Sequence, residues 1–135
     1  MKKVWFIALL GLTLGSCDKK ERQTPTFEMD TPFQLTQGQT AECSCGEVSI
    51  TLLKIDDSRC PTTVDCFWAG MVTVDLDLKG TSLTLGLDTN GQVAATGSYG
   101  NYSIRLLEVN PYPQVPGELE QKDYTVTLKV TRTIR

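Results

Sequence analysis

Apolar and polar residues alternate with a period of two along most of the chain, and no strong helical period is present. Valine and leucine fill every second position of residues 72–78, and a similar run covers residues 124–131. Successive side chains of a strand point to opposite faces, so each run predicts a strand with one buried face. Further strands are predicted over residues 48–55, 83–87 and 102–109. A change of phase near Leu53 and another near Leu107 indicate β-bulges.

The remaining segments predict turns, loops and two weaker strands. Asn90-Gly91 is a strong turn signal, and we expect a short strand around Val93 after it. Residues 79–82 predict a turn, residues 97–101 predict a loop, and an early strand is expected near residues 27–33. Three prolines make residues 110–117 a stiff connection that cannot lie in a central strand.

Six or seven short strands separated by frequent turns indicate an all-β domain. We expect a small β-barrel of the OB type, closed or partly open, because strands with bulges suit closure. The alternative is a β-sandwich. The chain of 135 residues allows one domain, which we place at residues 27–135.

The beginning of the chain has the pattern of an export signal. Two lysines follow Met1, an apolar run of about 11 residues comes next, and Leu14-Gly15-Ser16-Cys17 resembles a bacterial lipobox. The run is shorter than the roughly 20 residues of a membrane-spanning helix. We therefore predict a signal peptide over residues 1–16, acylation such as palmitate on Cys17 and a flexible tether over residues 17–26. The expected location is the outer membrane, lipid-anchored and facing the periplasm or the outside.

Charge and composition narrow the classes of function. The chain has 13 Lys and Arg against 16 Asp and Glu, a net charge of −3, so it lacks the basic surface that nucleic acid requires. It contains no histidine, which excludes Ser-His-Asp and Cys-His catalytic pairs and histidine-ligated zinc. We predict a non-enzymatic binding or inhibitory protein that needs no cofactor and no metal, and that is a monomer.

Four cysteines remain after Cys17, and an even number in an exported chain predicts two disulfides. A bridge between Cys43 and Cys45 would close a very tight ring, and strain disfavours it. We therefore expect each of them to pair with Cys60 or Cys66, in either order. A zinc site with four cysteine ligands is the alternative, but the spacing within each pair is not the usual one.

The strings DSRCP at residues 57–61 and CFWAG at residues 66–70 resemble a motif of small exported bacterial lipoproteins, as does NPYP at residues 110–113. The resemblance covers residues 45–113 and extends to the potempins, lipoprotein peptidase inhibitors with a β-barrel core. It implies that the chain inhibits a secreted peptidase. For three residues of the motif we expect structural roles: Arg59 pairs with Asp57 or Asp65, Trp68 packs against the disulfides, and Gly70 lets the chain enter the next strand.

Two segments are candidates for contact with a peptidase. Cys43-Ser44-Cys45 resembles, only locally, the Cys-x-Cys of animal tissue inhibitors of metalloproteinases, and bridged cysteines would hold Ser44 in a pre-organised conformation. The stiff loop that carries Tyr112 and Pro113 is the second candidate. We therefore expect an inhibitor of a secreted metallopeptidase that blocks the active-site cleft with a disulfide-braced rim. The alternative is a cell-surface or periplasmic lipoprotein that binds another protein or a glycan.

Overall fold

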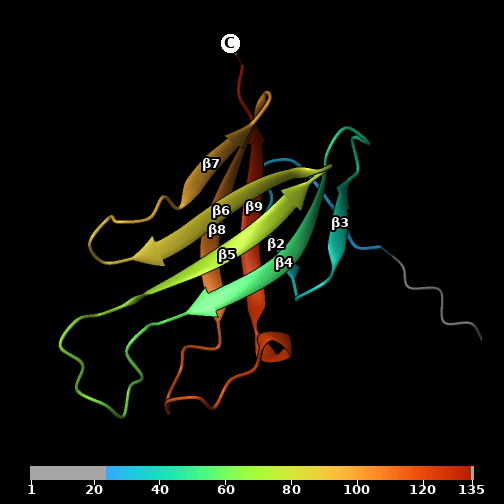
Figure 1. The fold of residues 1–135 in the computed structure, drawn as a ribbon. Coiled ribbons are helices and arrows are strands. Elements are labelled where there is room, and N and C mark those ends of the chain that lie inside the picture. Colours follow the sequence, from blue (N-terminus) through green and yellow to red (C-terminus); the bar gives the residue numbers. More distant parts are fainter. Residues whose placement is uncertain (1–23, 135) are drawn as a thin grey trace, which may run out of the picture.

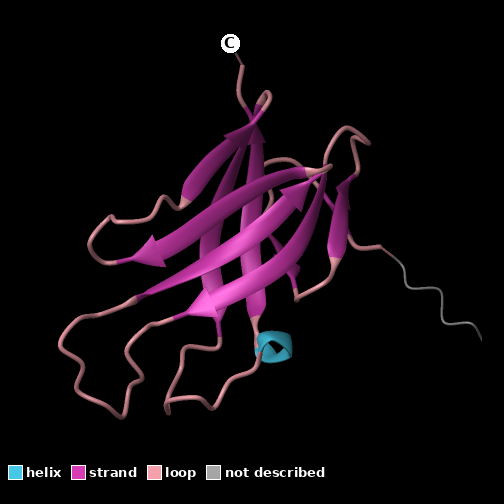
Figure 2. Ribbon diagram, in the orientation of Figure 1, coloured by secondary structure: helices cyan, strands magenta, loops and turns pink. Residues whose placement is uncertain are grey.

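The computed structural model describes residues 24–134, which form two β-sheets packed face to face (Figure 1). The predicted export signal, Cys17 and most of the predicted tether lie outside the described residues. The strands are β1 (Thr26–Phe27), β2 (Phe33–Leu35), β3 (Thr40–Cys43), β4 (Ser49–Asp57), β5 (Met71–Leu78), β6 (Thr81–Asp88), β7 (Thr96–Tyr99), β8 (Tyr102–Asn110) and β9 (Thr125–Arg132). One 3-10 turn, η1 (Gln121–Asp123), precedes β9 (Figure 2).

The nine strands divide between a five-stranded sheet, in the order β1-β3-β4-β5-β6, and a four-stranded sheet, in the order β2-β9-β8-β7. All pairings are antiparallel except that of β1 with β3. The predicted all-β class is confirmed. The described strands form two sheets and no closed barrel, an arrangement that fits the sandwich alternative.

The core fills the space between the sheets with the residues that the alternation places inward. In β5 every second residue is buried, and β9 shows the same pattern. Both predicted bulges are present, one between Leu52 and Lys54 in β4 and one between Leu106 and Glu108 in β8. In β4 the bulge at exposed Leu53 returns Ile55 to the buried face. In β8 the bulge at exposed Leu107 does the same for Val109.

Several predicted boundaries are wrong. The early strand is split, because β1 ends at Phe27 and β2 begins at Phe33 on the other sheet. No strand forms around Val93. Residues 96–99, expected in part as a loop, form β7, which pairs with β8 through a tight turn at Gly100-Asn101. Short strands with few apolar residues are set by tertiary pairing, which local alternation does not reveal.

The loops gather at the two ends of the sandwich (Figure 1). One end carries residues 58–70, 89–95 and 111–124, and we call it the Cys60 end. The other carries residues 44–48, 79–80 and 100–101, and we call it the Cys43 end. The nine residues of β4 separate the two ends by about 30 Å.

Candidate functional site

The cysteines pair within each end and not between the ends. Cys43 is bonded to Cys45, and Cys60 is bonded to Cys66. The expected pairing between the two segments is therefore wrong, because β4 holds them a strand length apart. The Cα atoms of Cys43 and Cys45 are 5.0 Å apart, within the range that a disulfide can join.

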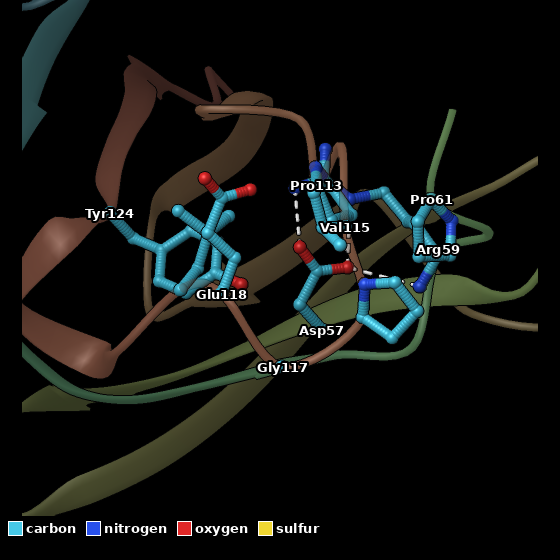
Figure 3. A pocket seen from close by; sticks show the side chains of 10 residues that line it. Asp57, Arg59, Pro61, Pro113, Val115, Gly117, Glu118 and Tyr124 are labelled. Carbon is cyan, nitrogen blue, oxygen red and sulfur yellow. Dashed lines mark hydrogen bonds and ion pairs between the residues drawn. The ribbon is translucent and has the colours of Figure 1, made fainter. Parts of the chain in front are cut away.

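The Cys60 end is organised around an ion pair. Arg59 Nη2 donates to Asp57 Oδ2 at 2.6 Å, and Arg59 Nε donates to Asp57 Oδ1 at 2.8 Å. The guanidinium thus binds the carboxylate in a bidentate manner (Figure 3). The two side chains are 12% and 4% exposed. A forked pair of this kind is stronger and more directional than a single contact. Of the two partners predicted for Arg59, the structure selects Asp57.

Arg59 also ties the loop after β4 to the loop after β8. It donates to the carbonyl oxygens of Val109 at 3.0 Å and Pro111 at 3.1 Å, and its guanidinium lies 4.6 Å from the ring centroid of Tyr112. Five N–H donors in one plane allow a single arginine to hold a carboxylate and two carbonyl groups together. Beyond the predicted ion pair, Arg59 therefore joins two loops.

Further hydrogen bonds run between the same two loops. Thr62 N donates to Pro113 O at 3.2 Å, and Thr63 Oγ1 donates to Gln114 O at 2.6 Å. Pro113 is buried, whereas Tyr112 is exposed. Tyr112 is therefore the member of the predicted contact pair whose side chain a partner can reach.

A hollow of about 290 Å³ lies beside the ion pair, bordered by Asp57, Arg59, Val115, Glu118 and Tyr124 (Figure 3). Burial raises the pKa of Tyr124 to about 12, and the negative charge of Asp57 with a hydrogen bond to its carboxylate acts in the same direction. The phenol therefore stays neutral near pH 7. The described residues contain no group of side chains arranged to hold a metal ion.

The end of the disulfide loop presents two aromatic side chains to solvent. Phe67 is fully exposed and Trp68 is 73% exposed. The expectation that Trp68 packs against the disulfides is wrong, because the core between the sheets is filled by strand residues and the loop projects beyond it. The sequence signal was present, since two adjacent aromatic residues next to a cysteine lack the alternation of a buried strand.

Gly70 returns the loop to β5, as predicted, and its conformation requires glycine. Its φ is +69°, and a Cβ atom at this position would lie 1.9 Å from the carbonyl oxygen of Ser58. No side chain fits there without a shift of the backbone.

We expect Gly70→Ala to lower the free energy of unfolding by about 2–5 kcal/mol. Left-handed backbone costs about 1–2 kcal/mol, and crowding adds about 1–3 kcal/mol. Gly91→Ala is the matched control, because Gly91 has the same φ of +69° and a Cβ atom added there would have no neighbour within 4 Å. Urea denaturation of both variants separates the two contributions, and equal losses would contradict the role of the Ser58 contact.

The Cys43 end holds Ser44 in an exposed turn. Ser44 N donates to Phe27 O at 2.9 Å, and Cys43 is buried whereas Cys45 is exposed. Glu47 accepts hydrogen bonds from Tyr102 and Arg132, and the bond from Tyr102, followed by the charge of Arg132, lowers the pKa of its carboxyl group. One disulfide and one polar cluster thus order this turn. The two predicted contact segments lie at opposite ends of the molecule.

Comparisons of the chain with protein-family models, with curated proteins and with solved structures find no match. Within residues 24–134, no helix has the length and apolar character needed to cross a membrane. The function is therefore inferred from the two loop ends and from the motif.

Proposed function

We propose that this chain is an exported lipoprotein, anchored to the outer membrane through Cys17, that inhibits a secreted peptidase without catalysis. The observation that carries the proposal is the concentration of exposed apolar side chains at the Cys60 end. Eight large hydrophobic residues are exposed in the described chain, and five of them lie there: Val64, Phe67, Trp68, Tyr112 and Val115. Tryptophan and tyrosine are the residue types that most often dominate binding energy at interfaces.

The construction of the loops supports the same proposal. The Cys60–Cys66 bridge, the Arg59 contacts and the hydrogen bonds to residues 113–114 order the loops before any partner arrives. Ordered loops lose little conformational entropy on binding, so more of the contact energy appears as affinity. Peptidase–inhibitor complexes are typically of this pre-organised kind.

We place the primary contact at the Cys60 end and not at the Cys43 end. Ser44 is exposed and well ordered, but few apolar side chains surround it. The two ends are separated by the length of β4, so a single active-site cleft cannot receive both. A contact that includes Ser44, Cys43 and Cys45 is the competing arrangement for the same function.

The experiment is a titration of the soluble chain, residues 18–135, against secreted metallo-, serine and cysteine peptidases. This piece contains every described strand and both disulfides. We expect a sharp equimolar endpoint with one class. Metallopeptidases are tested first because the competing contact segment, residues 43–45, resembles the Cys-x-Cys of metalloproteinase inhibitors. Undiminished activity of every peptidase at a large excess of the chain would contradict the proposal.

A second candidate function is binding of a glycan or another envelope protein. The exposed rings of Trp68 and Tyr112 favour it, because aromatic faces also form apolar platforms for ligands. Trp68 is the only tryptophan after residue 16, so its fluorescence reports binding directly. Saturable quenching by an oligosaccharide, together with a flat peptidase titration, would favour this candidate.

A further inference from the structure

The outer face of the four-stranded sheet carries a pair of neighbouring cations. Arg105 of β8 lies directly opposite Lys129 of β9, and Thr96 of β7 lies opposite Arg105 on its other side. Directly opposed residues of an antiparallel pair project from the same face with Cβ atoms about 5 Å apart. This face lies on the side of the sheet away from the core, and it belongs to neither loop end.

The two cations have no partner in the part of the chain that the structure describes. Residues 24–134 contain seven lysines and arginines, and the other five each bind a carboxylate or a carbonyl group. Arg105 and Lys129 form no ion pair and no side-chain hydrogen bond with any described residue. Glu108 is the nearby carboxylate on β8, where it pairs with Thr127 of β9. It forms no ion pair with Arg105 or Lys129.

Like charges placed directly opposite each other destabilise a sheet. The chain is acidic overall, so a pair of neighbouring positive side chains on it is not a consequence of a generally basic surface. A bound anion would turn this repulsion into attraction, because it would accept hydrogen bonds from both side chains.

A hollow of about 420 Å³ lies over the pair. Three residues with a side-chain hydroxyl group line it, Thr96, Ser103 and Thr131, and Pro32 and Leu107 line it as well. The hollow therefore offers one guanidinium, one ammonium and three hydroxyl groups within a single site. This number of donors exceeds what the two oxygens of a carboxylate would use, and it suits the three or four oxygens of a phosphate.

We propose that this hollow is a binding site for a phosphate group. Arg105 binds two oxygens through its fork, Lys129 supplies the second positive charge, and the hydroxyl groups orient the remaining oxygens. The phosphate can be free in solution or can belong to the headgroup of an anionic phospholipid. The site is independent of the proposed peptidase contact, because it shares no residue with the Cys60 end.

The test is a titration of isotopically labelled residues 18–135 with inorganic phosphate at constant ionic strength, followed by backbone amide chemical shifts. We expect saturable shifts confined to Thr96 and to residues 103–107 and 129–131. Arg105→Gln and Lys129→Gln should each weaken phosphate binding about tenfold or more, since each removes a charge-assisted contact. Lys122→Gln is the matched control, because it removes the same charge from an exposed ion pair at the Cys60 end and should leave the affinity unchanged.

A second arm identifies the source of the phosphate. Wild-type and Arg105→Gln protein are mixed with phosphatidylglycerol or phosphatidylcholine vesicles. Binding of the wild type alone, and only to phosphatidylglycerol vesicles, would identify a lipid headgroup as the source. Absence of vesicle binding with retained phosphate shifts would assign a soluble phosphate. Both site variants should be at least as stable as the wild type to urea without phosphate, because each relieves the repulsion. Absence of saturable shifts, or shifts that persist unchanged in both site variants, would overturn the proposal.

Discussion

Replacing Phe67 and Trp68 together with alanine is expected to weaken inhibition of the target peptidase by at least about a hundredfold. Each ring is a large apolar contact of the kind whose removal from an interface costs about 2 kcal/mol or more, and tenfold in affinity corresponds to about 1.4 kcal/mol. Both rings are exposed, so the free energy of unfolding should change by less than about 0.5 kcal/mol. Inhibition constants and urea denaturation measure the two effects separately.

Leu53→Ala is the control for this pair. Leu53 is a large hydrophobic residue with 47% of its surface exposed, but it lies at the bulge of β4, away from the Cys60 end. Its truncation should leave the inhibition constant unchanged. If the double variant inhibited as tightly as the wild type, these aromatic residues would not be the contact.

Replacing Arg59 with alanine is expected to lower the free energy of unfolding by about 3–5 kcal/mol. The substitution leaves Asp57 as a nearly buried carboxylate without its counter-ion and removes a donor from two backbone carbonyl groups. Marginally stable domains do not tolerate a loss of this size easily. Thermal and urea unfolding of residues 18–135 measure the loss.

Two further variants separate charge from geometry at this position. Arg59→Lys keeps the charge but not the fork, so its loss should be intermediate between wild type and Arg59→Ala. Lys54→Ala removes an exposed ion pair with Asp56 and should cost less than about 1 kcal/mol. Equal stability of Arg59→Ala and Lys54→Ala would show that the buried pair does not hold the loops.

Alternation predicted the long strands well, because each buries one complete face in the core. The runs at residues 72–78 and 124–131 became β5 and β9, and both phase changes became bulges. The short strands β1, β3 and β7 have only two to four residues, too few for a pattern to appear. Whether the strands form one barrel or two sheets depends on which edges pair, and this is a property of tertiary contacts alone.

The candidate site was predicted in part. The motif pointed to Arg59 and Gly70, and the structure gives each a defined contact. The predictions of the disulfide pairing and of the environment of Trp68 were wrong for one common reason. Both depended on loop 58–70 folding back toward residues 43–45, whereas β4 carries that loop to the far end of the sandwich. Each cysteine therefore bonds to its neighbour in sequence at the same end of the sandwich.

The most direct test of a contact at the Cys60 end is amide hydrogen exchange of residues 18–135. It is measured for the chain alone and in complex with the peptidase that it inhibits. We expect binding to slow exchange in residues 61–69 and 111–117 and to leave residues 43–48 unchanged. Slower exchange confined to residues 43–48 would contradict a contact at the Cys60 end and would assign inhibition to the turn around Ser44.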